Sequence, residues 1–499
     1  MASHNDSRFA PGKLVAVIGA GIGGVSAAAY LLKEGLSVTV FERSEVCGGI
    51  WHFDERIPRD PPYPNDKPSL GDYEVSQRGE FASPTPPPEP ATDIKDAGNV
   101  NTDVEVSFAP PGPCYAGLKN NIPTSVLVNS LGPWPAGTEE TISQELAEKY
   151  INGLASDNGV AAVTQFHTRV DEIKPTPNNS KWEIRTVSLE KRHGGVRLKE
   201  RLHHFDLVVV ATGHYCTPRI PDFPGLPALK AAFPDRILHS KQYRRPQRFQ
   251  GQNVLVIGAG VSSSDICKEL VGIANTVYQS VRGGAYDTPT HLLPASTIRV
   301  GPISSFHLDP PTTLQTLPPS DPIPSLTITL NDNQTLTNIH TVILATGYIT
   351  SYPFLSALHD DSAPPESATP TTLITSDGDM VHNLHQDIFY IPNPTLSFIG
   401  VPYHAAAFTL FGFQAQVLAR AFAGRAKLPK EGEMREIYEK KAKEKGLGRG
   451  FHSLAGKGAE VAYVRGLVEW ANEDAEGETV EGPSDGWGEG GGEGGRLGI

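Results

Sequence analysis

Closely spaced cysteines are missing from this chain. Its 499 residues include only four cysteines, and no two of them stand at the spacing of a CxxC or CxxxxC pair. This argues against a zinc site, a disulfide scaffold and a dithiol redox centre, because each needs cysteines close together in the chain. We expect Cys47, Cys114, Cys216 and Cys267 to be ordinary buried thiols.

Long apolar runs and a strongly basic face are missing as well. No apolar stretch of about 18 residues runs without glycine, so the sequence predicts no membrane span. Lys and Arg number 43 against 56 Asp and Glu, and the formal net charge is −13. This excess of acidic residues argues against a nucleic-acid partner, because nucleic acids bind to clusters of positively charged side chains.

Both ends of the chain are polar. The N-terminal residues lead into an apolar strand without a signal-type apolar region, so we expect a cytoplasmic protein, with peripheral membrane association left open. Residues 473–499 contain eight acidic residues, and their only base is Arg496. Their high glycine content predicts a disordered acidic tail, which leaves the rest of the chain only mildly acidic.

The strongest pattern lies near the start, where residues 13–42 form an apolar strand, a glycine turn, an alanine-rich helix and a second strand. Gly19, Gly21 and Gly24 make the turn a GxGxxG, which lets backbone amides at the helix start meet a pyrophosphate. Glu42 ends the second strand, where a carboxylate accepts hydrogen bonds from a ribose. A lone GxGxxG is also a common tight turn, but strand, helix and acid in register predict a dinucleotide site.

A second glycine pair follows directly, in the segment CGGIW. Gly49 and its neighbour allow a large planar or sugar-bearing ligand to approach the backbone closely, and Trp51 offers a stacking face. A loop with a core tryptophan is the alternative interpretation. The position just after an ADP-binding unit favours a flavin.

The strand, turn and helix pattern restarts at residue 252 with the turn GAGVSS. Gly258 and Gly260 repeat the first two glycines, and Ser262 and Ser263 follow. Ser263 takes the third glycine position, where a small residue still permits close packing of helix on strand. Each of the two units is later closed by a strand that ends in Ala-Thr-Gly.

The second unit lacks the acid of the first. Its second strand ends near Ser280 and Arg282, which can donate hydrogen bonds to a 2′-phosphate, whereas a carboxylate would repel one. A plain surface cation is the alternative interpretation of Arg282. One acid-ended and one arginine-ended unit predict FAD plus NADPH, and hydride transfer between them.

The order of these motifs resembles the flavin-containing monooxygenase family, in its smaller fungal form. Between the first turn and the closing ATGY stand Tyr-x-x-Leu-x-x-Asn-x-Pro at residues 115–123 and a version of FxGxxxHxxxY at 233–243. Phe233, His239 and Tyr243 match the second motif, and Asp235 stands where the family has glycine. The resemblance covers about residues 13–430.

The resemblance implies roles for several residues. Asn121 would hold the oxygenated flavin and NADP⁺ in place, although the residues alone indicate an ordinary turn there. His239 would couple the two domains close to bound NADP⁺ and act as neither acid nor base. Gln416 resembles a family position near the flavin ring. His404 we interpret as a core or turn histidine.

The resemblance also implies the fold. We expect an α/β chain with two Rossmann-like dinucleotide-binding domains, in which the NADPH domain is inserted into a discontinuous FAD domain. The expected parts are residues 9–218 (FAD domain, first part), 219–349 (NADPH domain), 350–472 (FAD domain, second part) and 473–499 (tail). Residues 55–112 hold ten prolines between Pro58 and Pro90, so we expect an insertion there, outside the core.

The implied activity is oxygenation of a soft nucleophile. NADPH reduces the flavin, O₂ adds to give a C4a-hydroperoxide, and a thiol, thioether or amine takes the distal oxygen. The implied substrate is a fungal secondary metabolite. We expect no metal site, and a homodimer is left open.

Several alternatives remain open at this point. A Baeyer–Villiger oxygenase has a similar fingerprint that usually ends in Trp rather than at Tyr243, and an N-hydroxylating siderophore-type enzyme keeps ATGY but lacks residues 233–243. A flavin disulfide reductase needs the missing CxxxxC pair. A flavin-fold binding protein without redox activity is the non-enzymatic alternative.

Overall fold

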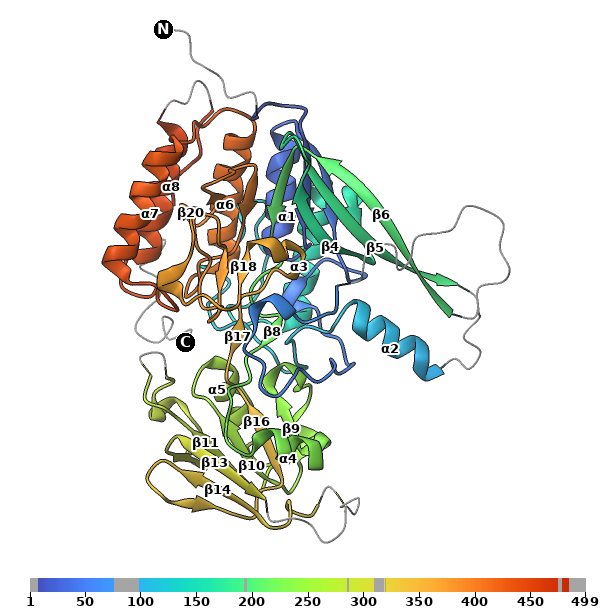
Figure 1. The fold of residues 1–499 in the computed structure, drawn as a ribbon, viewed down its shortest axis with the longest axis vertical. Coiled ribbons are helices and arrows are strands. Elements are labelled where there is room, and N and C mark those ends of the chain that lie inside the picture. The colour runs from blue at the N-terminus through green and yellow to red at the C-terminus, as the bar shows by residue number, and fades with distance from the viewer. Residues whose placement is uncertain are drawn as a thin grey trace.

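Two β-sheets, one wholly and one largely parallel, organise the chain, and each is built around one of the glycine turns. The computed structural model describes residues 8–75, 98–192, 195–284, 287–308, 318, 320–473 and 478–483. Figure 1 shows the sheets in separate bodies, the upper one with α1, α6, α7, α8 and β4–β6, and the lower one with α4, α5 and β9–β16.

The first sheet has seven strands in the order β20-β21-β22-β7-β1-β2-β3. Its strands are β1 (Leu14–Ile18), β2 (Ser37–Phe41), β3 (Thr164–Gln165), β7 (Leu207–Val210), β20 (Leu384–His385), β21 (Phe389–Tyr390) and β22 (Leu396–Phe398). The strands from β22 to β3 are parallel. Alternate residues of β1 enter different cores, Val15 and Val17 on one face and Ala16 and Ile18 on the other, so both faces of the sheet are covered.

Helices cover one face of this sheet and an antiparallel meander covers the other. The helices against the sheet are α1 (Ile22–Lys33), α3 (Gln144–Asp157) and α6 (Ala407–Phe422), with α7 (Glu431–Lys445) and α8 (Ala459–Asn472) further out. The meander is β4 (Thr168–Pro175), β5 (Trp182–Arg192) and β6 (Gly195–Phe205). A short parallel pair, β18 (His359–Asp360) and β19 (Ile374–Thr375), lies in the returning part of the chain.

The second sheet has five strands in the order β12-β11-β10-β16-β9, and every neighbouring pair is parallel. Its strands are β9 (Ile237–His239), β10 (Asn253–Ile257), β11 (Thr276–Ser280), β12 (Thr297–Val300) and β16 (Thr341–Leu344). Helix α5 (Val261–Glu269) packs on one face. On the other face lie α4 (Leu226–Ala232) and a meander of β13 (Ile303–Leu308), β14 (Leu326–Leu330) and β15 (Thr335–Leu336).

The chain crosses between the two bodies twice, and the crossings lie side by side. Strand β8 (Thr217–Pro218) leaves the first body and β17 (Tyr348–Ile349) returns to it, and the two pair in antiparallel fashion. One Rossmann-like unit is therefore inserted into the other, as the resemblance implied. Residues 237–239, expected to link the domains, instead form β9 at the edge of the second sheet.

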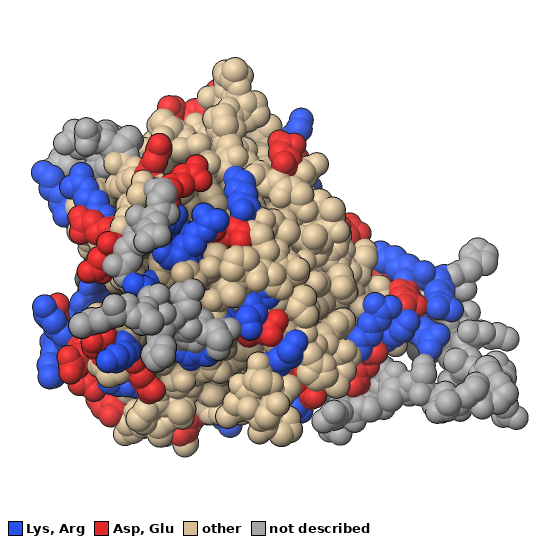
Figure 2. Space-filling model, turned by 90° about the horizontal axis from the view of Figure 1, so that it is seen from above, with Lys and Arg blue, Asp and Glu red and all other residues tan. Residues whose placement is uncertain are grey.

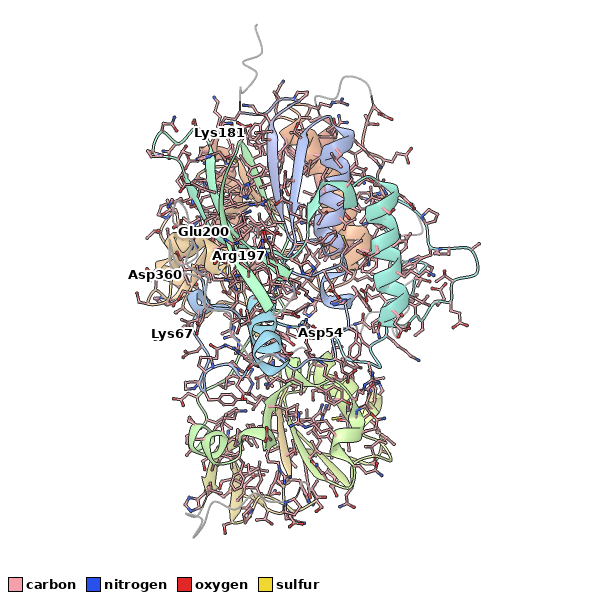
Figure 3. All side chains as sticks on the ribbon, turned by 90° about the vertical axis from the view of Figure 1, so that its right-hand side faces the viewer. Asp54, Lys67, Lys181, Arg197, Glu200 and Asp360 are labelled. Atoms are coloured by element: carbon pink, nitrogen blue, oxygen red, sulfur yellow. The ribbon has the colours of Figure 1, made fainter. Side chains whose placement is uncertain are left out.

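The prediction that residues 55–112 stay outside the core is wrong at several described positions. Asn65 is buried and pairs with Ile220 of the second body, and the Asp72 side chain, the partner of Arg43 and Lys241, is only 6% exposed. Figure 3 shows the flanking Asp54 and Lys67 at the level where the two bodies meet. Helix α2 (Gly98–Phe108) packs against β6. Residues 76–97 lie outside the described part.

The prediction of a disordered tail over residues 473–499 is wrong for residues 478–483. Val480 is buried and exchanges two hydrogen bonds with the Asn472 side chain, at 2.9 Å each, so residues 478–483 lie against the end of α8. Residues 474–477 and 484–499 lie outside the described part. On the face seen in Figure 2, Lys and Arg alternate with Asp and Glu in small groups over a largely uncharged surface.

Candidate functional site

The first glycine turn joins β1 to α1, and the helix begins directly on it. Gly21 is the N-cap, and no side chain makes a capping hydrogen bond to it. Gly24 lies so close to the turn that a Cβ there would be 1.9 Å from Gly19 O. The uncapped backbone amides at the start of α1 therefore face outward over a turn without side chains, which fits a pyrophosphate.

Glu42 stands just after β2, next to this turn. Its carboxylate is buried, with Oε2 accepting from the Ala20 amide at 2.7 Å and Oε1 from the Ser44 amide at 2.8 Å. These bonds fix its position at the edge of the glycine turn. Because a carboxylate has about four acceptor sites, Glu42 keeps capacity for the hydroxyls of a ribose, and that role stays a prediction.

The CGGIW segment lies against the same turn. Residues Gly49–Trp51 form a 3₁₀-helix, and a Cβ on Gly49 would be 3.0 Å from the Cα of Gly21. Trp51 contacts Phe408 edge to face at 5.9 Å. The structure thus brings together two segments that the sequence treated as neighbours only along the chain.

Helix α3 supports this segment from behind, which the sequence patterns did not indicate. Asn152 Nδ2 donates to Cys47 O at 2.7 Å, and Glu148 Oε1 lies 2.9 Å from His52 Nδ1. Both contacts join residues about a hundred positions apart. The sequence of this helix is amphipathic with Asn and Glu on one face, but this pattern does not indicate which residues the two side chains contact.

The structure distinguishes the two adjacent asparagines of the 115–123 segment. Asn120 is buried, and its side chain accepts from the Ile142 amide at 2.6 Å and donates to the carbonyls of Ile122 and Glu140 at 2.8 and 2.7 Å. Asn121 is exposed, and its side chain has no hydrogen bond to any described residue. Asn120 therefore shapes the loop, whereas the Asn121 amide is available to a ligand.

The second glycine turn repeats the construction of the first. Helix α5 begins after Gly260, again without a side-chain cap. Gly258 has a φ of 123°, and a Cβ there would be 2.2 Å from Ala345 O; the equivalent Gly19 packs on Ala211 O, at 2.8 Å. The repeated Ala-Thr-Gly thus has a structural purpose, because its Ala carbonyl supports the first glycine of each turn.

The four polar residues predicted around this turn divide into two pairs. Ser262 is exposed at the start of α5, and Arg282 is exposed beyond the end of β11. Ser263 is buried and its hydroxyl accepts from Gln279 Nε2 at 2.9 Å, while the Ser280 hydroxyl donates to Gly301 O at 2.8 Å. Ser262 and Arg282 are therefore the pair left exposed beside the turn, and their contact with a dinucleotide stays a prediction.

Arg299, on the next strand β12, was not predicted. Its guanidinium donates to Gln279 Oε1 at 3.0 Å and to Thr288 O at 2.6 Å, and the Thr288 amide donates to Ala259 O at 2.7 Å. Arg299 thus holds the loop after Arg282 against the glycine turn. The strand is short and has no motif, so the sequence offered no signal beyond its position.

His239, expected near bound NADP⁺, is engaged inside the protein. Nδ1 accepts from the Lys241 amide at 3.1 Å, Nε2 donates to Gly347 O at 3.0 Å, and no side-chain surface is exposed. Burial lowers the pKa of His239 to about 3. The ring is therefore a neutral structural link between β9 and the returning ATGY strand, which agrees with the expectation that it is neither acid nor base.

Asp235 does not need the conformation that only glycine adopts freely. It lies in the 3₁₀-helix Pro234–Arg236, is exposed, and is absent from the residues with positive φ. The mismatch with the family glycine therefore brings no backbone strain at this position.

Gln416 is not among the residues that gather at the turns. Its Nε2 donates to Ser130 Oγ at 3.2 Å, and the same Oγ accepts from Tyr30. Tyr30 lies eight residues along α1, about 12 Å from the helix start at 1.5 Å per residue. Gln414, two residues earlier on α6, is buried and accepts from the Gly400 amide at 3.0 Å.

A buried ion cluster joins the two bodies beside the first turn. Asp72 accepts from Arg43 at 3.0 Å and from Lys241 Nζ at 2.9 Å. Burial opposes ionisation of Asp72, but Arg43 and Lys241 outweigh it and hold the pKa of Asp72 well below its usual range. Arg43 directly follows Glu42, and Lys241 lies between His239 and Tyr243, so the cluster links the two dinucleotide units.

Two negative findings apply to the described part of the chain. No cluster of three His, Cys, Asp or Glu residues has the arrangement of a metal site. Among the described helices, none combines the length and the hydropathy required to cross a bilayer.

Comparison with known proteins agrees with this geometry. A family model described as flavin-binding monooxygenase-like matches residues 121–288, and a model of an NAD(P)-binding Rossmann-like domain matches residues 17–68. The flavin-containing monooxygenase ustF2 of Aspergillus flavus is 40% identical over 485 residues, which cover 92% of this chain and 91% of that protein. The flavin-containing monooxygenase iboF of Amanita muscaria is 31% identical over 490 residues, which cover 93% of this chain and 89% of that protein.

Solved structures share the fold. The S-allyl-L-cysteine S-oxygenase from Allium sativum superposes with a TM-score of 0.63 at 22% identity, covering 94% of this chain and 90% of that one. Together, the flavin-binding and NAD(P)-binding matches indicate FAD and NADPH as the cofactors.

Proposed function

Because this chain belongs to the flavin-containing monooxygenase family, we propose that it transfers one oxygen atom from a flavin C4a-hydroperoxide to a nucleophilic sulfur or nitrogen atom of a small molecule, at the expense of NADPH and O₂. One observation carries the proposal: two uncapped helix starts, at α1 and α5, stand in one chain, the first beside a buried acid and the second beside an exposed arginine. A thiol, thioether or amine is the substrate class.

The residues of the first unit would hold FAD. The start of α1 and its glycines would receive the pyrophosphate, and Glu42 the ribose. Gly49 and Trp51 would line the approach to the flavin ring. Bound FAD supplies the oxygen-transfer chemistry, and the protein's part is to bind, orient and keep water away.

The residues of the second unit would hold NADPH. The start of α5 with Ser262 would receive the pyrophosphate, and Arg282 the 2′-phosphate that distinguishes NADPH from NADH. Arg299 would act indirectly, because it holds the loop that carries Arg282 against the turn.

Asn121 would connect the two cofactors. Its amide is exposed, while the neighbouring Asn120 is bonded into the loop. The side chain is thus presented by a fixed backbone, which is what a group needs if it is to shield a reactive flavin. His239 is neutral and both of its ring nitrogens are engaged, so it supplies neither an acid nor a base, which suits an oxidant carried by the cofactor.

Sulfur or nitrogen oxygenation is favoured over ketone oxidation by Tyr243. It occupies the end of the fingerprint where Baeyer–Villiger oxygenases usually have Trp, and its hydroxyl is used in a hydrogen bond to Glu269 at 2.7 Å. An indole carries its N–H donor at a different position on the ring, so this bond to Glu269 fits the tyrosine hydroxyl.

The test is anaerobic reduction with NADPH followed by rapid mixing with oxygenated buffer. We expect a long-lived oxygenated flavin in the absorbance spectrum, and at least about a tenfold shorter lifetime in Asn121→Ala, which corresponds to about 1.4 kcal/mol. The matched control is Asn331→Ala, because Asn331 is an exposed asparagine in the turn between β14 and β15. An equal lifetime in all three proteins would remove Asn121 from the site.

The substrate class is tested with thioethers, thiols and amines against cyclic ketones. Sulfoxides or N-oxides are expected, with one equivalent of NADPH consumed for each product. Lactones as the main products would assign ketone oxidation instead. A protein that is reduced by NADPH but never forms an oxygenated flavin would be a reductase, and a colourless protein that takes up no FAD would be a binding protein.

A further inference from the structure

Helix α5 carries two carboxylates on one face, and each accepts a hydrogen bond from a tyrosine outside the helix. Asp265 and Glu269 are four residues apart, so they lie one above the other. Tyr115 Oη donates to Asp265 Oδ2 at 2.8 Å, and Tyr243 Oη donates to Glu269 Oε2 at 2.7 Å. The two tyrosines come from the two family segments, 115–123 and 233–243.

The two tyrosines also pack against each other. Their rings meet edge to face at 5.7 Å, and Tyr243 is 1% exposed in the core beneath α5, where Tyr115 joins it. Gly117 presses on the same carboxylate, since a Cβ there would be 1.8 Å from Glu269 Oε1. The segment that leads to Asn121 is therefore docked on the second half of α5 without free space.

The backbone of the two segments is joined as well. The Ala116 amide donates to Arg244 O at 3.0 Å. The buried Arg244 guanidinium donates to five carbonyl oxygens, those of Arg56, Gly112, Cys114, Lys241 and Tyr243. The contacts from α5 thus reach residues 115–117. Three residues further along the chain, the buried Asn120 side chain is held separately by Glu140 and Ile142, so the short segment before Asn121 is fixed at both of its ends.

The charges on α5 determine which partner donates in these two hydrogen bonds: the tyrosine hydroxyls donate and the carboxylates accept. Asp265 and Glu269 are like charges one turn apart and repel each other unless each has a donor. Burial raises the pKa of both tyrosine hydroxyls well above the usual value, so each stays a protonated donor. Burial also raises the pKa of Glu269. A cation also lies near this face, because Lys268 Nζ is 3.7 Å from Asp265 Oδ1.

We propose that Tyr115 and Tyr243 are positioning residues that tie the Asn121 segment to α5, so that a dinucleotide bound at the start of α5 fixes the place of the Asn121 side chain. The inference rests on the proposed function, because it assigns the start of α5 to NADP⁺. Helix α5 has nine residues and spans about 14 Å as a rigid rod. A ligand that restrains its first turn therefore restrains the carboxylates that the tyrosines hold.

Hydrogen–deuterium exchange of the FAD-loaded protein, with and without NADP⁺, tests the coupling directly. In the parent protein we expect NADP⁺ to slow exchange in residues 258–264 and also in residues 115–123. In Tyr115→Phe and Tyr243→Phe, residues 258–264 should still be protected, whereas protection of 115–123 should fall at least about threefold. Equal protection of 115–123 in parent and variants would overturn the proposal.

The lifetime of the oxygenated flavin gives a second readout. Both variants should shorten it several-fold and release more H₂O₂ for each NADPH, while the anaerobic rate of flavin reduction stays within about twofold. Glu269→Gln keeps an acceptor for Tyr243 and should fall between parent and Tyr243→Phe. Should Tyr243→Phe fail to fold, Tyr115→Phe and Glu269→Gln carry the same test.

Tyr438→Phe is the matched control, because that hydroxyl bonds to His382 at 3.3 Å, far from α5 along the chain and in the first body. It should behave as the parent in both measurements. If NADP⁺ protects neither 258–264 nor 115–123, the assignment of the dinucleotide site is wrong. If 258–264 alone is protected in the parent, only the coupling is wrong.

Discussion

The two dinucleotide units of this chain share their strand order but differ in how closely the helix sits on the glycine turn. Five parallel strands run β22-β7-β1-β2-β3 in one and β9-β16-β10-β11-β12 in the other. The first glycine of each turn packs on the carbonyl of an Ala-Thr-Gly alanine. At the third position, however, a Cβ on Gly24 would lie only 1.9 Å from Gly19 O, whereas Ser263 carries a Cβ.

The difference shows two ways to build the same anion-binding turn. In the first unit, helix and turn meet backbone to backbone. In the second, a side-chain network of Ser263, Gln279 and Arg299 fills the space and fixes the turn by hydrogen bonds. The first construction tolerates no change, while the second depends on bonds of about 1 kcal/mol each. The two units should therefore respond very differently to matched substitutions.

The largest effect is expected for Gly24→Ser, which copies the second unit into the first. The new Cβ overlaps Gly19 O, so α1 must shift away from the turn, at a cost of about 3 kcal/mol or more. The protein should be recovered without FAD or not folded at all. Flavin absorbance per protein and the thermal unfolding midpoint measure this. A stable variant with full FAD would show that the first turn is as tolerant as the second.

Acid should destabilise the first body more than the second. Four of its histidines, His214, His359, His382 and His385, have their pKa lowered to about 4 by burial, against His239 alone in the second sheet. In the unfolded chain a histidine has a pKa of about 6.5 and binds more protons than the folded chain between these values. Stability therefore falls as the pH drops from about 6.5 to 4.

His385 isolates this effect, because it is buried and neither ring nitrogen has a hydrogen-bond partner among the described residues. His385→Leu removes one titrating group and should recover about 2 kcal/mol at pH 5 relative to pH 7. Urea unfolding at the two pH values measures it. An unchanged pH slope in this variant would mean that His385 titrates with the same pKa in the folded and in the unfolded chain.

Much of this architecture could be predicted from the sequence, because local patterns carry it. The two strand-turn-helix units, the acid after β2 and the repeated Ala-Thr-Gly all lie within short stretches whose periodicity and glycines specify the structure. Strand β9 was missed since its three residues are too few to show periodicity. The fold of the described part of 55–112 was missed because the prolines were interpreted as a sign of exposure, whereas Asn65 is buried and the Asp72 side chain is only 6% exposed.

The site residues divide in the same way. Gly19, Gly21 and Gly258 follow from local chemistry. The resemblance assigned Asn121, and the structure adds a physical reason, because Ile142 and Glu140, some twenty positions away, and Ile122 occupy the Asn120 side chain. Asn152 and Arg244 act through contacts more than a hundred positions apart in the chain, and Gln414 and Arg299 through contacts 14 and 11 positions apart; no motif encodes any of them.

A smaller effect is expected for Arg282→Ala, which removes the cation that marks the second unit. The KM for NADPH should rise about tenfold, equivalent to about 1.4 kcal/mol, while the KM for NADH stays unchanged. Steady-state NADPH and NADH oxidation measure the two values. Arg245→Ala is the control, as that exposed arginine pairs with Glu55. Equal losses for both dinucleotides would place the 2′-phosphate elsewhere.

The smallest effect is expected for Ser263→Gly, the reverse of the first substitution. It removes an acceptor from the Gln279 amide and adds backbone freedom, which together cost about 1 kcal/mol. FAD content should be unchanged, and the KM for NADPH should stay within about twofold. Ser263→Ala separates the two causes, since it keeps the Cβ and loses the hydroxyl. A loss as large as that of Gly24→Ser would mean that both turns are equally tight, and that the Cβ of Ser263 supports α5 rather than being merely tolerated there.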